Sequence, residues 1–286
     1  MIILKALAII LLTPVAGGLL TGFDRVVTAR MQARRGPPLL QPFYDVIKLF
    51  QKEAIEVNMM HRFFVYLSMI FSLLTALLIL LGGDILLAVF SLTLASILFV
   101  LGGYASNSPY SLIGAQRELL QMMAYEPMIL LVSVGLYYVN HSFYIRDIVS
   151  GSVPAIAMLP GFFLGLLYVF TIKLRKSPFD LSMSHHGHQE IVKGIATEYS
   201  GKDLAVIEVT HWIEVIVSLS FVYVFFAYAA PLSRVFALAA CAGVYFLEIL
   251  IDNCFARAKW QYTLKSSWLV TAALGTANFI VLSVLR

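Results

Sequence analysis

The chain has 286 residues, of which 60% are hydrophobic and 13% charged, and its formal charge is +4. So few charged side chains cannot cover the surface of a water-soluble globule, which excludes an ordinary soluble enzyme. The basic residues are scattered without interleaved stacking aromatics, which argues against nucleic-acid binding. The two cysteines, Cys241 and Cys254, support neither a disulfide framework nor an iron–sulfur cluster. The composition indicates an integral membrane protein.

Eight apolar stretches are long enough to cross a bilayer, which takes about 20 residues. In chain order they cover residues 2–22, 63–81, 85–103, 119–139, 155–173, 212–229, 235–251 and 268–285. The first carries a single lysine and no cleavage signature, so we interpret it as a span and not as a cleaved signal peptide. The predicted fold class is an all-α integral membrane protein: a single membrane domain over residues 1–286, with eight transmembrane helices, an amphipathic surface helix and long cytoplasmic loops.

The distribution of basic residues predicts the orientation in the membrane. If the connections alternate sides, only Lys5, Arg146, Arg234 and Arg286 fall on the side opposite the other lysines and arginines. The positive-inside rule then places both termini outside and the long loops in the cytoplasm of a prokaryotic cell.

The first long loop contains a second helical pattern. Leu40, Phe43, Ile47 and Phe50 recur at helical spacing with polar residues between them, which predicts an amphipathic helix lying along the membrane surface. The pattern is equally compatible with a simple anchor for the loop and with a role in ligand entry.

Acids inside spans are candidate functional residues, because each costs roughly 2.5–3.5 kcal/mol on insertion scales. Glu126 directly precedes Pro127, whose ring would kink the helix and free the carbonyl of Met123. Glu118 lies beside Arg117, where an ordinary ion pair at the membrane edge is the simpler interpretation.

Two further groups of titratable residues recur at helical spacing. Glu208, His211 and Glu214 are three residues apart and could form a proton relay, although a histidine in an apolar helix is as often structural. Glu248 and Asp252 share one helix face, either as coupling acids or as partners of Arg257 or Lys259.

The stretch SPFDLSMSHHGHQE, residues 177–190, holds three of the six histidines. His185, His186 and His188 could suggest a metal site, but rings this close along the chain do not easily converge on one ion. No cysteine or H-E-x-x-H motif accompanies them. We expect a docking loop or chamber lining, and no metal.

Four loops carry a resemblance to a known family: DRVVTARMQARRGPPLLQPFYDVIKLFQKE (24–53), GGYASNSPYSLIGAQRELLQMMAYE (102–126), SPFDLSMSHHGHQEIVKGIATEYSG (177–201) and ARAKW (256–260). In this order they resemble the loops of the membrane subunit at the quinone-chamber end of respiratory complex I. They also resemble its counterpart in energy-converting, membrane-bound nickel–iron hydrogenases.

The RRGPPLLQP and SHHxHQE forms look like the Ech-type hydrogenase subunit, with the formate hydrogenlyase anchor similar. Complex I members typically carry a Glu before A-P-F-D and acids after it. Here the upstream run is Lys173, Leu174, Arg175 and Lys176, and the downstream run is rich in histidine. The alternatives are a quinone-chamber subunit of complex I, a formate hydrogenlyase anchor or, from another class, a stand-alone transporter or passive scaffold.

The resemblance implies roles for individual residues. Glu126, Glu190 and Glu198 match the acids of the family's proton-loading channel, and either Glu208 or Glu214 matches the next one. The interface and chamber loops would contribute Arg25, Arg34, Arg35, Asp180, His185, His186, His188 and Arg257.

The resemblance also implies an assembly. The partners would be the hydrogenase large and small subunits, an iron–sulfur electron-transfer subunit and an antiporter-like membrane subunit, with ferredoxin acting indirectly. No cofactor would be bound by this chain, because the nickel–iron centre and the iron–sulfur clusters would sit on partner subunits. The ion could be a proton or sodium.

Overall fold

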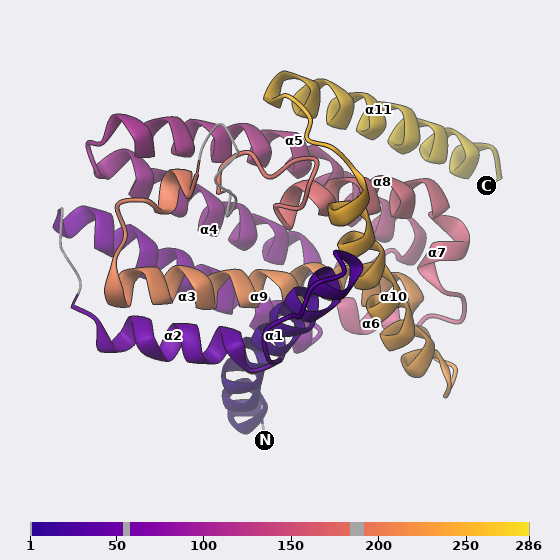
Figure 1. Cartoon of the computed structure of the whole chain (residues 1–286). Helices are drawn as coiled ribbons and strands as arrows, with labels where there is room; N and C mark the ends of the chain where they lie inside the picture. Colours follow the sequence, from indigo (N-terminus) through magenta and orange to yellow (C-terminus); the bar gives the residue numbers. More distant parts are fainter. Residues whose placement is uncertain (1, 54–57, 184–191, 286) are drawn as a thin grey trace.

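The computed structural model describes residues 2–53, 58–183 and 192–285, and these residues are predominantly helical (Figure 1). The helices are α1 (Ile2–Met31), α2 (Gln41–Gln51), α3 (Met59–Leu80), α4 (Ile85–Ala105), α5 (Pro109–Asn140), α6 (Ile145–Val149), α7 (Ala155–Met158), α8 (Pro160–Lys173), the 3₁₀ turn η1 (Gly194–Ala196), α9 (Gly201–Phe226), α10 (Ser233–Cys254) and α11 (Trp260–Leu285). The prediction of an all-helical chain is confirmed for the described residues.

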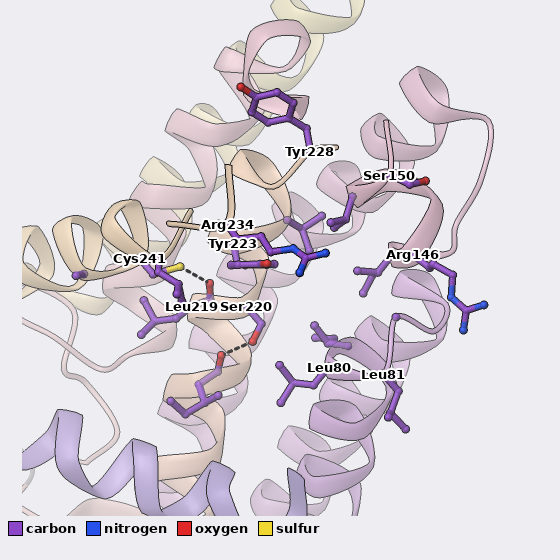
Figure 2. Close-up of a pocket in the computed structure, with 18 of the residues that line it drawn as sticks. Leu80, Leu81, Arg146, Ser150, Leu219, Ser220, Tyr223, Tyr228, Arg234 and Cys241 are labelled. Atoms are coloured by element: carbon purple, nitrogen blue, oxygen red, sulfur yellow. Dashed lines mark hydrogen bonds between the residues drawn. The ribbon is translucent and has the colours of Figure 1, made fainter. Parts of the chain in front are cut away.

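The longer helices run alternately between two ends of the bundle. At what we call the short-turn end, the α3–α4 turn, α6 and the α9–α10 turn meet, as shown by the bonds Ile145 N to Gly83 O (2.9 Å) and Ala229 N to Gly151 O (3.0 Å). A cavity opens there between α3, α6, α9 and α10 (Figure 2). The opposite, long-loop end carries the connections 32–40, 174–200 and 255–259.

Six of the described helices are long and apolar enough to cross a membrane: α1, α3, α4, α5, α9 and α10. The apolar helix α8 has only 14 residues, and α11 packs along α5 and α8. The chain is therefore a multi-pass membrane protein, and the number of eight spans stays a prediction.

The predicted continuous helix over 155–173 is wrong. It is divided into α7 and α8 at Leu159, whose backbone leaves the helical region with φ −123° and ψ 46°. The next residue, Pro160, explains the break, because proline disfavours helical geometry at the residue before it and fits the first position of a new helix.

A close contact between α1 and α9 sets the position of α2. A Cβ atom on Gly17 would collide with the backbone of Trp212, so glycine lets the two helices touch there. The ring of Phe43 packs on the same Trp212 with centroids 5.2 Å apart. The helix predicted in the first long loop therefore forms, with Ile47 and Phe50 exposed. Whether it lies on a membrane surface stays a prediction.

Candidate ion-coupling site

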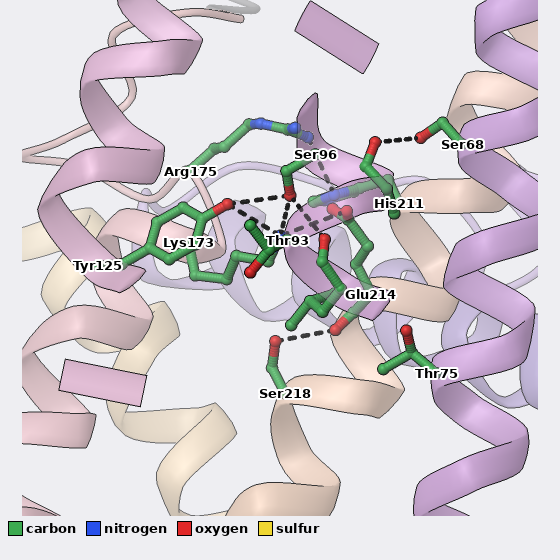
Figure 3. A network of polar contacts seen from close by, with 12 residues as sticks. Ser68, Thr75, Thr93, Ser96, Tyr125, Lys173, Arg175, His211, Glu214 and Ser218 are labelled. Carbon is green, nitrogen blue, oxygen red and sulfur yellow. Dashed lines mark hydrogen bonds and ion pairs between the residues drawn. The ribbon is translucent and has the colours of Figure 1, made fainter. Parts of the chain in front are cut away.

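A lysine is buried at the point where α8 ends. Lys173 Nζ lies 3.3 Å from Glu214 Oε1 on α9 and 3.3 Å from Tyr125 Oη on α5 (Figure 3). It also donates to Ser96 Oγ on α4 at 3.2 Å. The side chains of Lys173 and Glu214 are only 3% and 8% exposed, so this ion pair is almost fully shielded from solvent.

The chain continues from this pair into a second one. Arg175 is the second residue after the end of α8, and it donates from Nη2 to Glu118 Oε1 at 2.7 Å. Ser182 bonds the other oxygen of Glu118. The guanidinium Nη1 also lies 3.4 Å from Nδ1 of His211. Burial by itself would lower the pKa of Arg175, but the charges of Glu118 and Glu214 outweigh it, so its pKa lies above the ordinary value.

These four residues form a balanced group of charges, which we call the charge quartet: Glu118, Lys173, Arg175 and Glu214. Two carboxylates and two cations cancel, which is how buried charges are tolerated in an apolar bundle. A small cavity of about 20 Å³ lies between the quartet and His211, and its wall includes Ser68 and Ser96. That volume has room for about one water molecule with polar partners, so the gap between His211 and Glu214 can be bridged.

A second cluster ties α1 to α10 at the long-loop end. Lys176 Nζ lies 3.1 Å from Asp252 Oδ2 and also pairs with Asp24 of α1. Asp252 Oδ1 accepts from the backbone N–H of Ser177 at 2.8 Å. Burial would lower the pKa of Lys176, but the two carboxylates outweigh it and raise the pKa. The predicted pairing of Asp252 with Arg257 or Lys259 is replaced by pairing with Lys176.

Arg257 instead pairs with Asp180, so two predicted loop residues are brought together. Burial is the main cause that raises the pKa of Asp180 to about 6; the charge of Asp252 adds to the rise, and the charge of Arg257 opposes it. This carboxyl therefore titrates close to neutral pH at the base of the long loops.

Glu248 is the least compensated acid of the described residues. Its side chain is fully buried on α10, one turn from Asp252, and neither carboxyl oxygen has a hydrogen-bond partner among those residues. A carboxyl group in this situation is expensive to keep in an apolar bundle, which favours a functional reason for its presence.

Other predicted acids lie nearer the surface. Glu126 is half-buried, and the carbonyl of Met123 that Pro127 frees accepts a bond of 3.1 Å from the indole of Trp268 on α11. Glu198 and Glu208 are also half-buried, and the structure places no described cation within ion-pair distance of either.

The remaining predicted loop residues fall into two groups. Arg25 pairs with Asp45 at 2.7 Å, and Arg34 and Arg35 are exposed. His185, His186, His188 and Glu190 lie outside the described residues. Within the described part of the chain, no group of three histidine, cysteine or acidic side chains could hold a metal ion. The metal question for the histidine cluster is therefore untested.

Sequence reasoning missed most of the cations that define the site. Lys173, Arg175 and Lys176 follow one another at the end of α8, and each pairs with an acid on a different helix. Their signal was a basic run ending an apolar segment, which ordinarily marks the edge of a span. Glu118 was assigned to Arg117, but adjacent helix residues point in different directions, and its partner is Arg175.

Fold and site together define a class: a multi-pass helical membrane protein with buried, paired charges beneath its long loops. The family described as NADH dehydrogenase matches residues 4–283. The chain belongs to this family.

Known relatives fall in several oxidoreductase complexes. Component C of hydrogenase-4 from Escherichia coli K12 is 29% identical over 93% of this chain and 90% of its own length. Chain 1 of NADH-ubiquinone oxidoreductase from Paracentrotus lividus is 32% identical over 82% of this chain and 78% of its own. A chain in the structure of the membrane-bound sulfane sulfur reductase, an archaeal respiratory membrane complex, superposes with a TM-score of 0.89 at 26% identity, covering 98% and 99% of the two chains.

Proposed function

We propose that this chain is the membrane subunit of an Ech-type energy-converting hydrogenase. It anchors the soluble nickel–iron arm and couples ferredoxin-dependent hydrogen evolution to translocation of protons or sodium ions. The relationship to a hydrogenase-4 component supports the hydrogenase assignment. The observation that carries the coupling role is the charge quartet, which leads from Glu118 beside the long loops to Glu214 and Lys173 inside the bundle. The redox centres belong to partner subunits, and this chain supplies charge and proton movement.

The quartet offers an electrostatic route for coupling. A proton that arrives on Glu214 removes its charge and leaves Lys173 buried without its direct ion-pair partner, a change of about 3–5 kcal/mol for buried pairs. Moving one ion against 100 mV costs about 2.3 kcal/mol. A single protonation event in the quartet therefore has the right scale to drive one ion across the membrane.

The test removes the mobile charges while sparing the fold. The double variant Lys173→Met with Glu214→Gln leaves no buried charge unpaired, so the complex should assemble and retain hydrogen evolution from an artificial donor. In vesicles it should lose ion uptake, because the charges proposed to couple the two processes are gone. The matched control is Asp147→Asn, which neutralises an exposed acid at the short-turn end, away from the interface loops, and should leave ion uptake intact. Unchanged ion uptake in the Lys173 and Glu214 variant would refute the proposal.

A second candidate differs in the arm that the subunit carries. The likeness to the sulfane sulfur reductase chain, at a TM-score of 0.89, favours an arm that reduces sulfane sulfur. The relationship to chain 1 of NADH-ubiquinone oxidoreductase supports a third alternative, an arm that reduces quinone. Purification of the complex separates the three: nickel with hydrogen evolution, sulfide release from polysulfide, or inhibitor-sensitive quinone reduction. Purification of this chain alone, active in solute transport, would contradict all of them.

A further inference from the structure

A large cavity lies at the short-turn end, away from the charge quartet. It measures about 1120 Å³ and opens between the last turn of α3, α6, α9 and α10 (Figure 2). Its walls are mainly apolar and include Leu80, Leu219 and Leu238. Leu20 and Tyr245 also line it, and Tyr245 donates to the carbonyl of Leu20 on α1 at 3.2 Å.

One cation extends into this cavity. Figure 2 shows Arg234 reaching from the first turn of α10 into the space between the helices, whereas Arg146 on the rim turns away from it. Arg234 forms no hydrogen bond or ion pair with any residue that the structure describes. Tyr223 and Tyr228 also line the cavity, and Figure 2 shows Tyr223 next to Arg234. The cavity thus has an apolar interior and a free guanidinium group near its mouth.

We propose that this cavity binds one phospholipid, with its phosphate against Arg234 and an acyl chain between α3, α9 and α10. Arginine binds phosphate through charge-assisted, often bidentate, hydrogen bonds. Arg234 follows the turn between two helices that are long enough to span a membrane, which is the level of the lipid headgroups.

The size of the cavity favours a lipid over a helix of a partner subunit. A helix about 10–12 Å across would fill it in roughly two turns, far less than a span needs. The volume also exceeds the roughly 300–1,000 Å³ of sites for small, drug-sized ligands. The flexible acyl chain of a phospholipid fits such an irregular apolar space, and the phosphate of its headgroup supplies a counter-charge for Arg234. This inference does not depend on the proposed function, because it concerns the opposite end of the bundle.

The experiment measures lipid that stays bound. The complex is purified in mild detergent, washed, and analysed for phospholipid phosphorus in the wild type, Arg234→Gln and Lys5→Gln. Arg234→Gln should lower retained phospholipid by about one molecule per chain, because the phosphate loses its charge-assisted bonds. Lys5→Gln removes an exposed basic residue of α1 that does not line the cavity, and it should change nothing.

A second measurement locates the acyl chain. Phosphatidylglycerol with a photoactivatable diazirine on its acyl chain is added in vesicles to the washed complex. We expect cross-links on α9 and α10, reduced about tenfold in Arg234→Gln. Ala242→Phe, which fills the wall of the cavity, should reduce them with Arg234 intact. Equal phospholipid retention in the wild type and Arg234→Gln would overturn the proposal. So would binding of inorganic phosphate without acyl cross-links, or a partner helix cross-linked inside the cavity.

Discussion

Glu214 and Glu248 are both buried carboxyl groups on neighbouring helices, and their surroundings differ sharply. Glu214 is 6% exposed and meets Lys173 at 3.3 Å, whereas Glu248 is 0% exposed and meets no donor among the described residues. The difference arises because the end of α8 and the connection after it bring three cations into the bundle, and none of them forms a salt bridge with α10 at the level of Glu248. Whether a buried acid has a cationic partner thus depends on the segments packed against it as much as on its own helix.

The sharpest way to break this comparison is to remove the partner of Glu214. Lys173→Met should lower the free energy of unfolding by about 3–5 kcal/mol, because it leaves an uncompensated buried carboxylate. Adding Glu214→Gln should restore most of the loss. Unfolding of the purified protein by denaturing detergent measures both changes. Arg25→Gln, in a half-exposed pair, is the control and should cost less than about 1 kcal/mol. A loss of that small size in Lys173→Met would show that the pair is not shielded.

An intermediate effect is expected at Asp180, whose pKa is raised from 3.8 to about 6. Between these two pH values the folded state holds a proton that the unfolded state has released. Stability from this group is therefore fully present below about pH 4 and is lost as the pH rises through 6.

Unfolding midpoints measured from pH 4 to pH 7 should fall more steeply in the wild type than in Asp180→Asn, which cannot titrate. Asp45→Asn serves as the control, since that acid lies in a half-exposed ion pair. Identical pH profiles for the wild type and Asp180→Asn would contradict the assignment of the titration to Asp180.

The smallest effect on stability is expected at Glu248. Glu248→Gln removes no ion pair or hydrogen bond formed with the described residues, so the free energy of unfolding should change by less than about 1 kcal/mol. The same denaturing-detergent assay compares it with Lys173→Met. A loss as large as that of Lys173→Met would mean that Glu248 has a strong partner, and the contrast between the two acids would disappear.

The helices follow from the sequence because long apolar runs leave few alternatives in a membrane. The break at Leu159 was in principle readable from Pro160, yet apolar length outweighed it in the prediction. The partners of the buried acids were not readable. Helix spacing proposes neighbours on one helix, as it did for Asp252 with Arg257, whereas the actual contacts join α1, α5, α9 and α10 to the segment after α8. Such contacts depend on tertiary packing, which one sequence does not reveal.

The candidate site divides in the same way. His211 and Glu214 were predicted to act together, and the structure places both around Arg175 and Lys173. Their predicted neighbour Glu208 lies on the same helix without a described cation, because the stripe drifts around the helix and only part of it faces α8. Periodicity found the helix face, and packing decided which of its members meet a charge.

The bond between Trp268 and Met123 bears on the order in which the protein can be completed. Pro127 leaves the Met123 carbonyl of α5 without its helical donor. The indole N–H that donates to this carbonyl comes from Trp268 of α11, 145 residues further along the chain. Until α11 has been synthesised and has docked, the middle of α5 lacks one of its hydrogen bonds, and an apolar bilayer offers no water to replace it. The last helix, α11, therefore completes the hydrogen bonding of α5 close to the acid Glu126.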